Sequence, residues 1–105
     1  MKNKKRISQF RSAREAFNEE LVKSKKNRKI YLKTALEDYK KDRDLPAFLL
    51  ALRTITIASG GVNNLAEKTN LNRQTIYKAL SSNGNPSFSM IDLILSSLGM
   101  ELKVG

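Results

Sequence analysis

The stretch VNNLAEKTNLNRQTIYKALS, residues 62–81, decides how this chain folds. Its apolar residues recur at helical spacing and predict two short helices, over about 62–69 and 73–81. Between them lies a tight turn that contains Asn70, and Asn is the non-glycine residue best able to adopt a positive φ. Asn72 then offers its side chain as the cap of the second helix. The stretch therefore predicts two short helices joined by a three-residue turn.

The outward face of the second helix carries the residue types that read base edges or hold phosphates. We expect Arg73 and Gln74 to contact bases, because Arg pairs with guanine and Gln with adenine in two-pronged fashion. Tyr77 is expected to pack its ring against the protein and to leave its hydroxyl available to a phosphate. The candidate DNA-binding residues are Asn72, Arg73, Gln74, Thr75, Tyr77 and Lys78. The plainer alternative is a pair of ordinary helices whose outer face is polar because it is wet.

This pattern resembles the helix-turn-helix of the λ-repressor/Cro type. Ala66 is small where two such helices approach closely, and Leu71 and Ile76 fill the angle between them. Asn70 stands where glycine is more usual. The resemblance implies a DNA-binding domain whose second helix enters the major groove.

Apolar periodicity predicts further helices on both sides of this motif. The first helix is expected over about 9–24. The second should begin near 27–30 and end at the polar stretch 40–44. The third should begin at Asp44 and Pro46 and end at Ser59-Gly60-Gly61, and the last should cover 89–98. In the third of these, Ala47, Leu50, Ala51 and Ile57 nearly complete a ring of apolar residues, which predicts burial on more than one side.

The end of the chain has a different pattern. Ser89 and Asp92 resemble a capping box for the last helix, and that helix should run to Gly99. Residues 100–104 alternate apolar and charged side chains, which predicts a short strand. The fold class is therefore all-α, a compact bundle of about five to six helices with a short C-terminal strand. A lone strand needs a pairing partner, so we expect a homodimer formed through this region.

Composition excludes most enzyme chemistry. The 105 residues contain no Cys and no His, which removes zinc sites, thiol nucleophiles and the commonest general base. The carboxylates of residues 37–44 lie at an ordinary charged helix end and do not indicate a metal site. We predict no catalysis, no cofactor and no metal. No apolar run is long enough to span a membrane, and the basic start is not followed by a signal-peptide core, so we predict a cytoplasmic protein.

The positive charge is concentrated at one end. The formal net charge is +10, from 20 Lys and Arg against 10 Asp and Glu, which indicates a polyanionic partner. Residues 1–29 hold eleven Lys or Arg against three Glu and form a basic arm and helix. Residues 30–105 form the helix-turn-helix domain. The arm, with Lys2, Lys4, Lys5 and Arg6 and together with Arg11 and Arg14, either lies along DNA or is a solvated terminus, and the sequence leaves both open.

Residues 30–104 resemble a known family, the addiction-module antidote proteins, a branch of helix-turn-helix antitoxins related to the HigA type. The most specific part of the resemblance is Tyr77-Lys78-Ala79-Leu80-Ser81 followed by Gly84-Asn85-Pro86 and Ser89. It implies the antitoxin of a type II toxin–antitoxin module, which binds a RelE/ParE-like toxin and represses its own operon as a dimer. The toxin-binding surface stays open, because a basic N-terminal segment does not suit the basic surface of a ribonuclease-like toxin.

Two other functions compete with this interpretation. One is a stand-alone prophage or chromosomal repressor without a toxin. The other is a basic RNA-associated structural protein, which would need exposed aromatic side chains for base stacking.

Overall fold

The computed structural model describes residues 12–100, and this part of the chain is entirely helical. The all-α prediction is confirmed there. Its six helices are α2 (Ala13–Lys23), α3 (Lys25–Asp42), α4 (Leu45–Ala58), α5 (Gly61–Thr69), α6 (Arg73–Ala79) and α7 (Phe88–Ser97). The expected basic arm lies outside the described residues, as do residues 101–104 of the expected strand.

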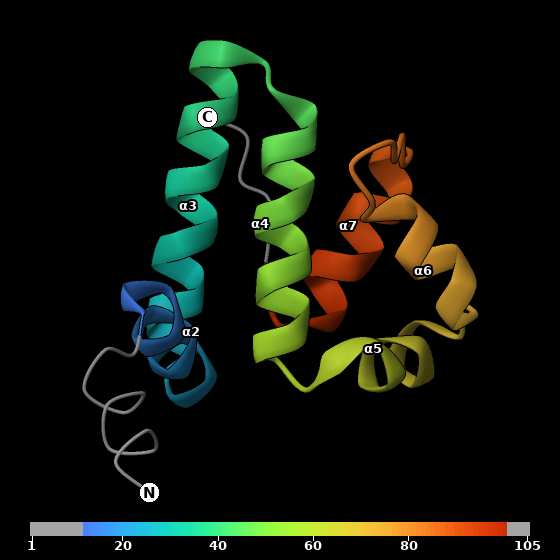
Figure 1. Cartoon of the computed structure of the whole chain (residues 1–105). Helices are drawn as coiled ribbons and strands as arrows, with labels where there is room; N and C mark the ends of the chain where they lie inside the picture. Colours follow the sequence, from blue (N-terminus) through green and yellow to red (C-terminus); the bar gives the residue numbers. More distant parts are fainter. Residues whose placement is uncertain (1–11, 101–105) are drawn as a thin grey trace, which may run out of the picture.

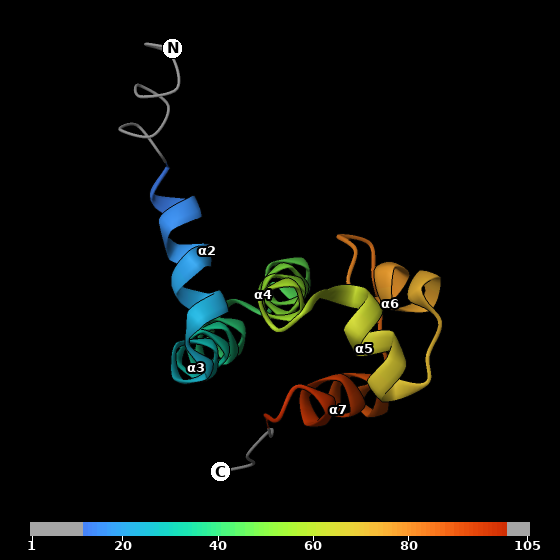
Figure 2. The ribbon, with the colours of Figure 1, turned by 90° about the horizontal axis from the view of Figure 1, so that it is seen from below.

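The helices are arranged around α4 (Figure 1). α3 and α4 run antiparallel along each other, and α2 packs near the start of α3. At the end of α4 the chain bends by 93° into α5. Figure 2 shows α2 and α3 on one side of α4, and α5, α6 and α7 on the other.

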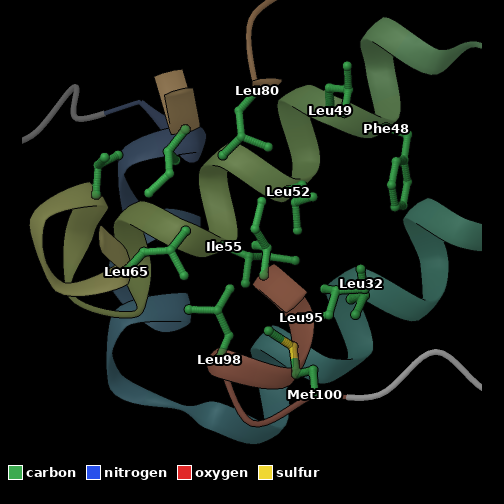
Figure 3. Packing of buried hydrophobic residues seen from close by; sticks show 13 residues of the cluster. Leu32, Phe48, Leu49, Leu52, Ile55, Leu65, Leu80, Leu95, Leu98 and Met100 are labelled. Atoms are coloured by element: carbon green, nitrogen blue, oxygen red, sulfur yellow. The ribbon is translucent and has the colours of Figure 1, made fainter. Parts of the chain in front are cut away.

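One hydrophobic cluster joins the two sides (Figure 3). α4 contributes four of its largest members, and each side chain of this size stabilises the fold by about 1.5–3 kcal/mol when fully buried. The cluster comprises Leu32, Phe48, Leu49, Leu52, Ile55, Val62, Leu65, Ile76, Leu80, Ile94, Leu95, Leu98 and Met100. α5 packs against α4, α6 and α7, and both α5 and α6 place side chains in this cluster, so the two short helices are anchored to the core.

The prediction that α4 is buried on more than one side is wrong in part. Ala51 is buried with the core, but Ala47, Leu50 and Ile57 are exposed, Ile57 at 62%. The buried residues of α4 occupy a single face of the helix. Its other face remains in solvent because no described element packs there.

The break between α2 and α3 is a single residue, Ser24, whereas the sequence placed the start of the second helix near 27–30. Ser24 is both the C-cap of α2 and the N-cap of α3. Its backbone N–H donates to Glu20 O at 3.1 Å, and its Oγ accepts from Asn27 N at 3.1 Å. Arg28 reaches back from α3 and donates from Nη1 to Leu21 O at 2.8 Å and to Val22 O at 3.1 Å. These bonds satisfy the last carbonyls of α2. α3 therefore begins at Lys25 despite its crowded positive charge.

Two expectations about helix ends need correction, and one is confirmed. Asp44 caps α4 as expected, accepting at Oδ1 from Ala47 N at 3.1 Å. The cap of α7 is Ser87, not Ser89, because Ser87 Oγ accepts from Met90 N at 3.1 Å. α7 ends at Ser97 with Leu98 as its C-cap, and Gly99 follows with a φ of +75°, while the N–H of Met100 donates to Leu95 O at 2.8 Å. Met100 therefore closes the helix and is buried in the core, so it does not begin a strand.

Among residues 12–100 no single helix has the length and hydropathy to cross a membrane. α4 and α5 reach the required length only when they are taken together, across their bend.

Candidate nucleic-acid interface

The α5–turn–α6 unit has the local geometry that its sequence predicts. Asn70 adopts a left-handed conformation with φ +60° and ends α5. Asn72 caps α6, and its Oδ1 accepts from Thr75 N at 2.7 Å. Leu71 packs against the core between these two residues, and Ile76 is fully buried. The angle between α5 and α6 is therefore set by buried contacts and by the two asparagine caps.

Four polar or basic side chains share the outward face of α6. All four are exposed, and they form two pairs in which the second residue follows one helical turn after the first. The pairs are Arg73 with Tyr77 and Gln74 with Lys78. Ile76 and Ala79 occupy the opposite side and are buried. Asn72 is also exposed, and Thr75 is half-buried at the edge of the face. The six predicted residues therefore lie together on α6 and its N-cap, and Figure 2 shows α6 at one end of the molecule.

The expectation for Tyr77 is wrong. Its side chain is 57% exposed, so its ring does not pack into the protein as expected. The neighbouring Ile76 fills the core position, and the helical turn directs Tyr77 about 100° away from it. Both the ring and the hydroxyl of Tyr77 are therefore accessible to a ligand.

Asn63 belongs to this surface, and the sequence interpretation missed it. Arg73 Nη1 donates to Asn63 Oδ1 at 3.1 Å, which links α6 to α5 across the turn. Both side chains are exposed. The spacing of ten residues carries no local signal, since the contact depends on how the two helices cross. The bond occupies one side of the guanidinium and leaves its other N–H groups free to donate.

The exposed face of α6 carries positive charge and groups that donate hydrogen bonds. It offers a guanidinium, an ammonium, an amide and a phenol, and α6 carries no acidic residue. Such groups bind phosphates and the acceptor-rich edges of guanine and adenine. Within residues 12–100 no group of three or more His, Cys, Asp or Glu side chains could hold a metal ion.

The fold of residues 12–100 and this face define a small helical domain that presents the polar, basic face of α6 to solvent. Residues 13–105 match the family model described as "Probable addiction module antidote protein". The chain belongs to this family, whose members act as antitoxins, are generally not enzymes and have a toxin as their partner. No curated protein and no solved structure matches the chain.

Proposed function

We propose that the protein is a sequence-specific DNA-binding repressor and the antitoxin of a type II toxin–antitoxin module, and that it represses its own operon. The observation that carries the proposal is the exposed face of α6, which holds Arg73, Gln74, Tyr77 and Lys78. The opposite face of the same helix is buried, and Asn72 caps its start. A helix fixed in this way can enter the major groove with its side chains already placed. Asn72 and Thr75 lie at the helix start, where they would face the DNA backbone.

Binding to the DNA upstream of the protein's own gene tests this proposal. We expect a pseudo-palindromic site with half-site centres roughly 10 base pairs apart, or a multiple of that. Gln74→Ala should cost about 1–3 kcal/mol and relax the preference at one position of each half-site. Lys41→Ala, at an exposed position of α3, which lies across α4 from α6, is the charge-matched control for Arg73→Ala. Unchanged specificity in folded Arg73→Ala and Gln74→Ala proteins would mean that α6 does not read DNA.

The antitoxin role is tested separately. The partner that we propose is a RelE/ParE-like toxin encoded beside this gene. Co-expression should restore the growth of cells that make the toxin and should give a complex that co-purifies. DNA binding in the absence of any such toxin would instead identify a stand-alone repressor.

We further propose that the protein binds DNA as a homodimer formed through α7 and the residues after it. α7 presents Phe88 and Leu93 to solvent, at 70% and 39% exposure. A test by truncation should stop after Met100, because removal of Met100 would open the core. The chain shortened to residue 100 should sediment as a monomer at micromolar concentration. A dimer that persists would exclude residues 101–105 from the interface.

The exposed aromatic side chains favour one second candidate, binding of single-stranded RNA. Tyr77 and Phe88 are 57% and 70% exposed, and stacking on such rings is a common mode of RNA recognition. Competition between operator duplex and a single-stranded RNA of equal length distinguishes the two. A repressor should prefer the duplex, whereas an RNA-binding protein should prefer the single strand and lose affinity when Tyr77 is replaced by Ala.

A further inference from the structure

A groove of about 770 Å³ lies between α3 and the end of α7. Its floor is formed by the apolar side chains of Leu32, Leu36 and Met100. Leu36 is half-buried, and the other two are buried. Along α3 the groove extends from Lys29 to Lys40, which corresponds to about 17 Å of helix. Figure 2 shows α3 on the far side of α4 from α6, so this groove is remote from the proposed DNA-reading face.

The rim of the groove is basic. Lys29, Lys33 and Lys40 line it, and Glu37 is the one carboxylate among the described lining residues. On the opposite wall the described lining residues are Ser96, Gly99 and Met100, and none of these three is charged. Lys25 extends the basic row, since its Nζ lies beside Gly99 at the end of α7. A ligand that fills this groove must therefore combine apolar groups with negative charge.

The surroundings of the groove favour a helical peptide as that ligand. α3 uses its backbone N–H and C=O groups within the helix, so the groove offers no free strand edge to an extended peptide. Nucleic acid would suit the lysines, but its phosphodiester groups gain nothing from a floor of Leu32, Leu36 and Met100, and none of the lining residues within 12–100 has an aromatic ring for base stacking. An amphipathic helix places apolar side chains along one stripe and charged ones beside it, which matches both floor and rim.

We propose that this groove is the toxin-docking surface of the protein and that an acidic amphipathic helix of the toxin occupies it. The inference rests on the proposed antitoxin function. It also accounts for a basic antitoxin, because the positive charge of α3 faces an acidic element of the partner and not the basic, RNA-binding surface of a ribonuclease-like toxin. Since α3 and α6 lie on opposite sides of α4, toxin and DNA can be bound at the same time.

The direct test uses a fluorescein-labelled peptide of about 12 residues, with Leu at positions i, i+3, i+4 and i+7 of a helix and Glu on its other faces. Anisotropy should show binding to the full chain. The double variant Lys29→Glu, Lys33→Glu should weaken this binding by about tenfold. The matched control, Lys26→Glu with Lys41→Glu, changes the charge of α3 equally outside the groove lining and should bind as the parent does.

Several results would overturn the inference. The first is equal binding of the peptide to the parent and to the Lys29, Lys33 variant, and the second is equal binding of a peptide in which Lys replaces Glu. Binding only to a chain shortened after Met100 would assign the groove to the chain's own residues 101–105. Loss of operator affinity in the Lys29, Lys33 variant, without peptide binding to the parent, would assign it to phosphates.

The same variants separate this inference from the proposed function. A toxin that binds the parent but binds the Lys29, Lys33 variant about tenfold less tightly supports both. A toxin that binds both proteins equally leaves the antitoxin function in place and overturns the docking surface. A neighbouring toxin-like protein that binds neither overturns the antitoxin function, and with it the assignment of the groove to a toxin.

Discussion

The bond between Arg73 and Asn63 should make a measurable contribution to DNA affinity, although neither its length nor its exposure makes it a strong contact. It is 3.1 Å long and lies between two exposed side chains, so its contribution to the free energy of unfolding should be below about 1 kcal/mol. In a DNA complex, however, the same bond holds the long Arg73 side chain in place before binding. Immobilising such a side chain on binding costs about 0.5–1.5 kcal/mol. Asn63→Ala should therefore weaken operator binding by about 2- to 12-fold and leave the melting temperature nearly unchanged.

A double-mutant cycle measures this effect. Operator affinity is determined by anisotropy for the parent, Asn63→Ala, Arg73→Ala and the double variant. Arg73→Ala alone should cost about 1–3 kcal/mol. Asn63→Ala should have almost no further effect once Arg73 is absent, because there is then no guanidinium to position. If Asn63→Ala costs as much without Arg73 as with it, the positioning argument is refuted and Asn63 acts on DNA by itself.

Three further predictions concern the stability of the elements that carry the two surfaces, and each is checked by thermal unfolding. Asn70 has a φ of +60°, so Asn70→Ala should be less stable than Asn70→Gly by about 1 kcal/mol, and equal stabilities would contradict the role assigned to this turn. Gly84→Ala should destabilise the protein by about 1–3 kcal/mol, because the added Cβ would collide with the backbone carbonyl of Ala79, whereas Asn85→Ala should have little effect. Arg28→Met should cost about 1 kcal/mol and expose α2 to proteolysis, since it removes the donor to the last carbonyls of that helix, and unchanged proteolysis of α2 would mean that this cap is dispensable.

The helices and the tight turn between α5 and α6 could be predicted from the sequence because they depend on neighbours in the chain. Helical periodicity, the left-handed Asn70 and the capping by Asn72 and Asp44 act over three or four residues, and all three features are present in the structure. The same locality explains why the exposed basic face of α6 could be identified before its surroundings were known. The antitoxin interpretation also came from the sequence, from the resemblance of residues 30–104 to a known family.

The features that the sequence did not predict all depend on how the helices pack against one another. Periodicity marks the apolar side chains of α4, but only the packing of its neighbours determines that Leu50 and Ile57 stay in solvent. Tyr77 was expected to be packed because the pattern cannot tell on which side of Ile76 the core lies. The pairing of Asn63 with Arg73 joins two helices, and the groove joins α3 to the end of α7, which is distant in sequence. The sequence by itself therefore determined the helices, the turn and the polar, basic face of α6, whereas the tertiary structure decided which faces are buried and which distant side chains form one surface. The physical reason is that burial and contacts between helices depend on packing between residues that are distant in the sequence. The apolar pattern within a single helix does not specify which other helix will cover it.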